Sequence, residues 1–434
     1  MNVLLQTAVT LGVAGFVSNA NDLNWPEFRG PRGDGVTTSR NLPLHWTETE
    51  GVRWKTPIHG RAWSSPVIWE NQVWLTTASE DGRQLSVVGV DKAQGKVFLD
   101  KKLFDIEKPQ FAHKFNTYAS PTPAIEESRL YVSFGSPGIA CLDTKSGQVL
   151  WERRDFECNH FRGAGSSPIL YQDRLFLNFD GSDHQFIVAL DKKTGKTLWR
   201  QERSIDFKDL KPDGKPDADG DWRKAYATCQ IASFNGVTTL LSQGAKAFYA
   251  YNPKTGDEFW RLEERQSHSG GTRPVVGHGL VFFPSGWSQG LTLAVKPGKA
   301  GDVLDVNIDP PSPSSTLQIA WRSKRSTPKK PALTLVDDLL LGVEDGGVAT
   351  CWEAKTGNVV WNERIGGNYS ASPLVSGDRL YCFSEEGKTV VLSATHTFQK
   401  LAENTLADGF MASPTVSGEA LFLRTKTHLY RIER

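Results

Sequence analysis

Short apolar runs separated by turn residues recur along the chain. One recurrent phrase has an aspartate, then Thr-Gly or Ser-Gly, then an apolar run that ends in tryptophan, as in 142–151 and 190–199. Asp bonds to its own backbone in turns and Gly supplies a positive φ, so the runs on either side predict antiparallel hairpins rather than helices. Seven copies of this phrase end in an aromatic residue, at Phe98, Trp151, Trp199, Trp260, Trp321, Trp361 and Phe398.

A second phrase, in which Ser-Pro or a similar pair precedes alternating apolar residues, opens each unit. It stands at Ser65-Pro66, Ser120-Pro121, Ser167-Pro168, Arg273-Pro274, Ser372-Pro373 and Ser413-Pro414, with degenerate copies near 228–233 and 331–333. The spacing is about 50 residues per unit, which is typical of a four-stranded propeller blade. The repeat therefore predicts eight blades.

The last unit lacks one strand. Its strands lie between Met411 and Ile432, whereas the apolar segment around Trp54 precedes every opening phrase. Pairing the two would complete the eighth blade and leave no free sheet edge. The sequence thus predicts an all-β fold: an eight-bladed β-propeller of four-stranded antiparallel blades, closed by an N-terminal strand that joins the last blade.

Composition and charge exclude some classes of function. The chain has 50 Lys and Arg against 49 Asp and Glu, so it lacks the basic excess of a dedicated nucleic-acid-binding protein. Hydrophobic residues make up 38%, enough for a core but far below a polytopic membrane protein. We expect no nucleic-acid partner.

The cysteines do not predict a disulfide framework. Cys141, Cys158, Cys229, Cys351 and Cys382 form no CxxC pair and no metal-ligand spacing, and their number is odd. Cys141 and Cys351 occupy a position before the turn phrase that holds a small residue in six copies, the others being Gly89, Ala189, Ala250 and Ala294. We expect them to act as small hydrophobes that leave room for a tryptophan of the neighbouring blade.

The N-terminus has the pattern of an export signal. Residues 3–17 carry no charge, and Ser18-Asn19-Ala20 suits a signal-peptidase cut, although the preceding segment lacks Lys or Arg. We predict a signal peptide over 1–20, an N-terminal extension over 21–50 and a single propeller over 51–434. An uncleaved anchor and simple disorder of residues 1–20 stay as alternatives. Export places the protein in the periplasm or outside the cell, with no integral membrane span after signal cleavage.

The phrase at Ala189–Trp199 resembles the tryptophan-docking repeat of pyrroloquinoline-quinone (PQQ) enzyme-like eight-bladed propellers. The segment Trp25–Gly35 looks like the lead-in of a planctomycete-type group of exported PQQ-like repeat proteins. The periplasmic propeller of the outer-membrane β-barrel assembly machinery is similar in repeat and length. The resemblance covers nearly the whole mature chain and implies the fold.

Quinoprotein dehydrogenases share this fold, but the chain departs from their pattern. Many of those enzymes have adjacent cysteines that form a disulfide against the quinone, and no two cysteines are neighbours here. The calcium-binding Glu and Asn and the catalytic Asp of that family match no motif of this chain. The resemblance therefore implies the fold more directly than it implies PQQ or calcium.

Several polar and aromatic residues precede the blade openings. Segments that enter the innermost strands line one mouth of a propeller channel, so these residues form a candidate ligand site there. The alternative is that they are ordinary loop residues that satisfy turn backbones. The candidates are His113, Asn116, Tyr118, His160, Arg162, His268, Arg273 and Tyr369.

Asp217, Asp219 and Asp221 have the spacing of the first half of a calcium loop. Trp222 stands where such a loop requires Gly, and Thr228 where it requires the bidentate Glu. A solvated turn is therefore the favoured interpretation over a metal site. No motif for catalytic zinc, a P-loop, a dinucleotide fold or a nucleophile elbow is present.

The complete ring without a recognisable catalytic motif favours an exported, non-catalytic binding or assembly scaffold. We expect it to be a monomer that uses its channel mouth and faces to bind protein partners in the cell envelope, without a cofactor. The alternatives are a PQQ-dependent oxidoreductase and an accessory carbohydrate-binding protein, since Trp63 and Trp287 could stack on sugar rings.

Overall fold

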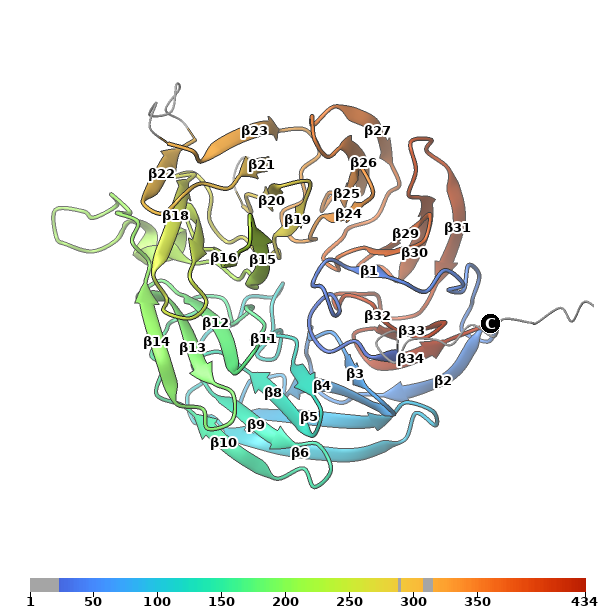
Figure 1. Ribbon diagram of the computed structural model, residues 1–434. Coiled ribbons are helices and arrows are strands. Elements are labelled where there is room, and N and C mark those ends of the chain that lie inside the picture. Colours follow the sequence, from blue (N-terminus) through green and yellow to red (C-terminus); the bar gives the residue numbers. More distant parts are fainter. Residues whose placement is uncertain (1–22, 288–289, 307–314) are drawn as a thin grey trace, which may run out of the picture.

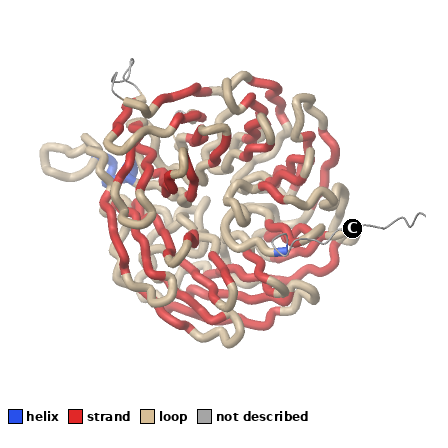
Figure 2. The backbone as a smooth tube through the Cα atoms, in the orientation of Figure 1, coloured by secondary structure: helices blue, strands red, loops and turns tan. Residues whose placement is uncertain are grey.

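The computed structural model describes residues 23–287, 290–306 and 315–434, and the predicted signal peptide lies outside these ranges. Within them, eight β-sheets surround a central channel like the blades of a propeller (Figure 1). Strands and loops make up nearly all of the fold, as Figure 2 shows. The predicted all-β, eight-bladed architecture is confirmed.

The first four blades follow one another along the chain, each ordered from the channel outward. Blade 1 contains β3 (Val67–Trp69), β4 (Gln72–Ala78), β5 (Gln84–Asp91) and β6 (Val97–Asp105). Blade 2 contains β7 (Ala124–Glu126), β8 (Arg129–Ser133), β9 (Ile139–Asp143) and β10 (Val149–Arg153). Blade 3 contains β11 (Ile169–Tyr171), β12 (Arg174–Asp180), β13 (Gln185–Asp191) and β14 (Thr197–Glu202). Blade 4 contains β15 (Gln230–Phe234), β16 (Val237–Gln243), β17 (Ala247–Tyr251) and β18 (Glu258–Glu263), and the 3₁₀ helix η2 (Asp217–Arg223) precedes it.

The remaining blades complete the circle. Blade 5 contains β19 (Val275–Gly277), β20 (Leu280–Pro284), β21 (Thr292–Lys296) and β23 (Gln318–Ser323). Blade 6 contains β24 (Thr334–Val336), β25 (Leu339–Val343), β26 (Val348–Glu353) and β27 (Val359–Arg364). Blade 7 contains β28 (Leu374–Ser376), β29 (Arg379–Phe383), β30 (Lys388–Ser393) and β31 (Lys400–Thr405). Blade 8 contains β32 (Thr415–Ser417), β33 (Ala420–Arg424), β34 (His428–Ile432) and, as its outer strand, β2 (Val52–Pro57).

The ring closes as the sequence predicts. Strand β2 pairs antiparallel with β34, with Thr56 opposite Leu429 and Pro57 opposite His428. The first and last parts of the described chain therefore share one sheet, which removes the free edge that an open ring would expose.

Outer-strand tryptophans join successive blades. The Trp151 indole of β10 lies over Gly195 in the β13–β14 turn of blade 3, and its Nε1–H donates to the carbonyl of Lys192 at 3.1 Å. A Cβ on Gly195 would come within 2.7 Å of the Trp151 ring, and its φ is +71°, so this turn requires glycine. The same pair of contacts links Trp54 to Gly95, Trp199 to Gly256 and Trp321 to Gly357 and their turns.

Two predicted outer-strand aromatics lie elsewhere. In blade 1 Leu99, not Phe98, stands opposite Gly89 and packs against the next blade's turn. In blade 7 Ala402 takes the corresponding place, and Phe398 precedes the strand. In blade 1 the difference is one residue, which moves the side chain to the other face of the sheet. In blade 7 the outer strand begins two residues after Phe398, so the recurrent phrase predicts the turns but not the pairing of these two strands.

The cysteines of the described chain are all free and buried. Cys141 stands opposite Trp151, and Cys351 opposite Trp361. Each small side chain thus accommodates the tryptophan of its own blade. The sequence analysis expected it to accommodate a tryptophan of the neighbouring blade instead. Burial raises the pKa of the Cys141 thiol to about 12, consistent with a packing role.

The segment 23–37 lies across one mouth of the channel and bonds to all eight blades. Its backbone pairs with Ile68 of blade 1 through Trp25, accepts from Ile125 of blade 2 and continues as β1 (Val36–Thr37) alongside β28. The other blades are reached by contacts of Leu23 with Ser417, Glu27 with Leu170, Arg32 with Gln230, Phe28 with Arg273 and Arg29 with Thr334. We call residues 23–37 the plug. The sequence analysis had treated this region only as an extension.

Strand β22 (Asp302–Asp305) lies between β21 and β23 in the chain but belongs to another blade. It pairs parallel with β18, with Asp302 opposite Trp260. Blade 5 therefore lends a fifth strand to the outer edge of blade 4. None of the helical turns in the described ranges has the length and apolar character of a membrane-spanning helix.

Candidate functional site

A ring of hydroxyl groups surrounds the channel where the inner strands begin. The ring position is two residues before each inner strand and holds Ser65, Thr122, Ser167, Thr228, Arg273, Ala332, Ser372 and Ser413 in blades 1 to 8. The N–H of Ser65 donates to Thr122 Oγ1 at 2.9 Å, that of Thr122 to Ser167 Oγ at 3.0 Å and that of Ser167 to Thr228 Oγ1 at 3.0 Å. In the same way Ala332 donates to Ser372, Ser372 to Ser413 and Ser413 to Ser65.

These bonds explain the second recurrent phrase. Each hydroxyl satisfies a buried N–H of the preceding blade, so the Ser of Ser-Pro links neighbouring blades. In blade 2 the linking pair is Thr122-Pro123, two residues after the predicted Ser120-Pro121. In blade 5 Arg273 replaces the hydroxyl and turns to the plug, donating to the Phe28 carbonyl at 2.6 Å and to Glu27 at 2.7 Å.

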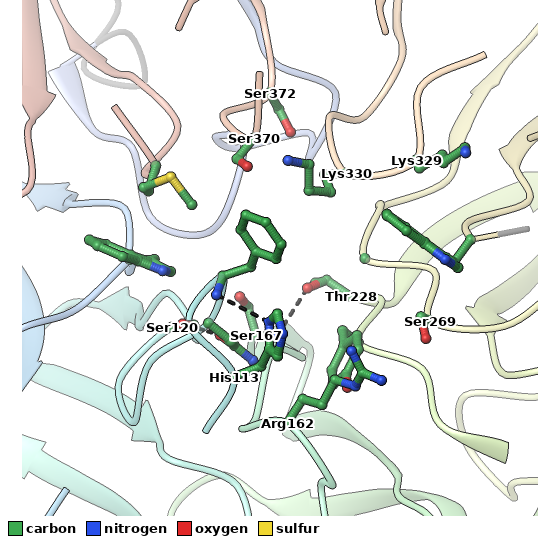
Figure 3. Close-up of a pocket in the computed structure, with 18 of the residues that line it drawn as sticks. His113, Ser120, Arg162, Ser167, Thr228, Ser269, Lys329, Lys330, Ser370 and Ser372 are labelled. Atoms are coloured by element: carbon green, nitrogen blue, oxygen red, sulfur yellow. Dashed lines mark hydrogen bonds between the residues drawn. The ribbon is translucent and has the colours of Figure 1, made fainter. Parts of the chain in front are cut away.

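A cavity of about 490 Å³ opens at the mouth of the channel beside this ring. The plug bonds to the inner strands three residues beyond the ring, at Ile68, Ile125 and Leu170, so it closes the other end. We call this cavity the cup. Its aromatic lining consists of Phe28, Trp63, Phe115, Tyr226 and Trp287, and its charged lining of Arg162, Asp221, Lys224, Lys329 and Lys330. The six ring hydroxyls, His113 and His268 also line it, and Figure 3 shows several of these side chains around one space.

The edge of the cup exposes aromatic side chains. Phe115 is 55% and Trp287 53% exposed, and Phe111, which contacts the His113 ring, is 66% exposed. Large exposed aromatics that gather at a concave site are typical of binding surfaces. Cations lie over both tryptophans, Arg61 at 5.3 Å from the Trp63 ring and Lys329 at 5.0 Å from the Trp287 ring.

The charged lining has more cations than carboxylates. Asp221 is the one carboxylate among the described lining residues, and it contacts both Arg162, at 3.2 Å, and Lys224. Lys330 forms an ion pair at 2.8 Å with Glu385, a residue that does not line the cup. The other lysines and the arginine leave the cup with a positive potential.

The histidines respond to this environment. Burial lowers the pKa of His268 to about 4, and the charges of Lys224 and Arg162 act in the same direction. Burial and the same two cations, together with Lys114, also lower the pKa of His113. Burial and Arg162 lower the pKa of Lys224 to about 7, so its charge titrates near neutral pH.

The structure places four of the eight predicted site residues in the cup: His113, Asn116, Arg162 and His268. Tyr118 and His160 line a separate, much smaller crevice. Arg273 holds the plug, and Tyr369 is fully buried in the apolar cluster between blades 6 and 7. Position before a blade opening thus identified the mouth, but the direction of each side chain depends on neighbouring blades.

The aspartates that resemble half of a calcium loop lie on η2. In the described chain, no group of three or more His, Cys, Asp or Glu is arranged to hold a metal ion. Asp221 is engaged by Arg162 and Lys224, and Ala218, Asp219 and Gly220 have positive φ, which gives the segment the geometry of successive turns.

The sequence analysis missed several cup residues. Lys224, Lys329 and Lys330 occur in segments without a repeat phrase, and Phe28 comes from the plug. The ring hydroxyls carried a signal, their recurrence before proline, but it pointed to scaffolding. Lys224 lies four residues before the degenerate opening at 228, a spacing comparable to that of the predicted residues.

Comparison with known proteins agrees with the architecture. A family model described as outer membrane protein assembly factor BamB matches residues 36–154, 86–221 and 315–400. The chain is 25% identical over 162 residues to a 1-butanol dehydrogenase (quinone) of Thauera butanivorans, a match that covers 34% of this chain and 23% of that protein. The match therefore spans less than a quarter of the length of the relative.

Solved structures with the same fold have different functions in their names. BamB from Moraxella catarrhalis has a TM-score of 0.57 at 14% identity, covering 88% of this chain and 99% of that one. The quinohemoprotein alcohol dehydrogenase ADHIIG from Pseudomonas putida HK5 has a TM-score of 0.62 at 13% identity, with coverages of 95% and 81%. The computationally designed Ika8 protein has a TM-score of 0.57 at 13% identity, with coverages of 92% and 99%. At these identities the likeness shows the fold alone.

Proposed function

Because the chain belongs to the family described as outer membrane protein assembly factor BamB, we propose that it is a binding scaffold of the cell envelope that holds a partner at the cup. The observation that carries this proposal is the exposed aromatic edge of the cup. The walls of the cup are joined by hydrogen bonds between the ring hydroxyls and the backbone of neighbouring blades. A rigid wall with exposed aromatics binds at a low cost in conformational entropy.

The proposed location is the periplasm or the cell exterior. The signal peptide predicted for residues 1–20 and the description of the family support export. We propose a monomer that binds envelope proteins through the cup and its edge, since aromatic and arginine side chains are the usual anchors of protein interfaces.

The residues of the cup do not match the quinone and calcium set that the fold resemblance implies. No adjacent cysteines are present, and every cysteine of the described chain is buried as a free thiol. The lining carboxylate Asp221 is already engaged by Arg162 and Lys224. We therefore assign binding rather than quinone-dependent oxidation to this cavity.

Carbohydrate binding is a second candidate, and one observation favours it. Trp63 and Trp287, which the sequence analysis named for stacking on sugar rings, both line the cup. Blades 1 and 5 are four positions apart in the ring of eight, so the two indoles come from opposite sides of the mouth.

Capture from envelope extracts tests the proposed function. The bait is the full chain, compared with a double variant Phe115→Ala/Trp287→Ala and with Leu198→Ala, which truncates an exposed apolar side chain of β14 away from the cup. We expect the unmodified chain and Leu198→Ala to retain the same envelope protein, and the double variant to lose most of it. Equal retention by the double variant would contradict the proposal, as would the absence of any retained envelope protein.

A further inference from the structure

The ring hydroxyls have unused donor capacity. Each of the six oxygens accepts an N–H from the preceding blade, and none of the six hydroxyls donates to an acceptor in the described part of the chain. A hydroxyl has one proton to donate in addition to its lone pairs. Since all six hydroxyls line the cup, they offer it an arc of hydrogen-bond donors that runs from blade 7 through blades 8 and 1 to blade 4.

The cationic side chains of the cup, like the ring hydroxyls, favour a ligand that accepts hydrogen bonds. Lys224, Arg162 and Lys329 line the same cavity, and Asp221 contacts the first two of them. Figure 3 shows Arg162 and Lys329 among the side chains around the cup. Donors and cations together favour an anionic oxygen group, because charge-assisted hydrogen bonds are about twice as strong as neutral ones.

The plug contains a buried guanidinium group. Arg29 is 2% exposed and donates through Nη2 to the Asp34 carbonyl and to Thr334 Oγ1 of β24. Its Nε and Nη1 have no hydrogen-bond partner among the described residues. Arg29 therefore has two unused donors within the plug, although it does not itself line the cup and Glu27 and Asp34 balance the charges of Arg29 and Arg32 there.

The aromatic lining of the cup suits a ring-shaped ligand rather than a bare ion. Trp63 and Trp287 supply indole rings from opposite sides of the cup. Asn116, Ser120 and Ser269 also line it, but Asn116 and Ser120 bond to each other and Ser269 bonds to His268, so the ring hydroxyls are the polar groups with unused donors. A saccharide presents C–H faces to aromatic rings and hydroxyls to polar side chains, and the cavity volume lies within the range of small-molecule sites.

We propose that the cup binds an acidic carbohydrate, a pyranose unit whose carboxylate accepts hydrogen bonds from the hydroxyl ring beside Arg162 and Lys224. This inference deepens the carbohydrate-binding candidate and rests on the proposed function only in placing the site at the cup. The charge and donor pattern distinguishes it from a site for neutral sugars.

Calorimetric titration of the full chain at pH 6 tests the proposal with three probes: a trimer of D-galacturonate, the neutral galactotriose and the acidic tripeptide Glu-Glu-Glu. We expect one-to-one binding of the galacturonate trimer, at least about tenfold tighter than binding of either other probe, as the loss of a charge-assisted hydrogen bond implies. Equal binding of galactotriose would overturn the proposal that the cup recognises a carboxylate. Equal or tighter binding of the peptide would overturn the carbohydrate.

Variants locate the site. Lys224→Met removes the charge at similar length, and Thr228→Val removes one ring hydroxyl at similar shape; each should weaken galacturonate binding severalfold or more. Lys145→Met removes the same charge from an exposed turn of blade 2 and should leave binding unchanged. If Thr228→Val lowers the yield of folded protein, Arg162→Gln tests the cup without touching a link between blades.

The outcomes separate this inference from the proposed function. If no saccharide probe binds while the Phe115→Ala/Trp287→Ala double variant still loses its envelope partner, the carbohydrate inference is overturned and the scaffold function stands. If galacturonate binds and both Lys224→Met and Thr228→Val weaken its binding, the inference is supported even where no envelope protein is captured. Equal weakening by Lys145→Met would show nonspecific attraction and overturn the site.

Discussion

His160 shows how one buried side chain depends on its protonation state. The backbone N–H of Ser136 donates to His160 Nε2 at 3.0 Å, and Nδ1 lies 3.7 Å from Cys158 Sγ. The neutral ring with its proton on Nδ1 satisfies both contacts, whereas protonation of Nε2 would place two donors face to face. Burial accordingly lowers the pKa of His160 to about 4.

This residue predicts a loss of stability in acid. Its pKa is near 6.5 when the chain is unfolded and about 4 when folded, so the unfolded state binds more protons between these values. The contribution of His160 is present above pH 6.5 and is lost as the pH falls toward 4, by up to about 3 kcal/mol. Guanidinium unfolding of the unmodified chain and His160→Gln across this range should give curves that converge at low pH. A constant difference between the two would contradict the assignment.

At the same scale, the sequence predicted part of the lining of the cup. His113, Asn116, Arg162 and His268 could be placed at the mouth because they precede inner strands. Tyr118, His160, Arg273 and Tyr369 occur in comparable segments, but their side chains turn to a crevice, the plug or the core. Those directions depend on contacts between blades, and no periodicity within one segment encodes them. Lys224 was missed because it precedes a degenerate copy of the opening phrase, near 228, which marks the start of blade 4 only weakly.

At the scale of elements, the turn between the third and fourth strands fixes how one blade meets the next. The Trp151 indole lies over the Gly195 turn and bonds to it, so the same glycine serves the hairpin and the contact between blades. The sequence revealed this unit because turn chemistry and the tryptophan are local and repeated. It did not reveal β22, whose parallel pairing with β18 depends on a connection that no other blade shares.

Substitution of the turn glycine tests this double role. Gly195→Ala forces Cβ toward the Trp151 ring at a φ of +71°, whereas Gly214→Ala has a similar φ of +77° with nothing within 4 Å. The conformational cost is about 1 to 2 kcal/mol in each, and overpacking adds about 1 to 3 kcal/mol in the first. Denaturant unfolding should therefore rank Gly195→Ala as the more destabilised. Equal destabilisation would mean that the contact with Trp151 contributes nothing.

At the scale of the whole molecule, the N-terminal region holds the ring together twice. Strand β2 completes blade 8, and the plug bonds to every blade across the channel. The sequence predicted the first contact because blade 8 was one strand short. It could not predict the second, because the plug reaches the eight blades through scattered hydrogen bonds and the two-residue strand β1, and it has no repeat of its own.

An engineered disulfide tests the closure. Pro57 and His428 are paired across β2 and β34, and paired residues of antiparallel strands have the Cα separation that a disulfide needs. We expect the two cysteines of Pro57→Cys/His428→Cys to form a disulfide that raises the midpoint of thermal unfolding, since the bridge restrains a long loop in the unfolded chain. Adding reductant should return the midpoint to its value before oxidation. The Pro57→Cys single variant is the control. Failure of the double variant to cross-link under oxidising conditions would contradict the pairing.

The central claim is that the cup is where this protein meets its partner. Site-specific photo-cross-linking measures this directly, with the reactive group placed at Phe115 on the edge of the cup or at Leu198 on the outer strand of blade 3. The account predicts that an envelope protein is cross-linked from position 115 and not from position 198. Cross-linking from position 198 alone, or to the same extent from both, would contradict it.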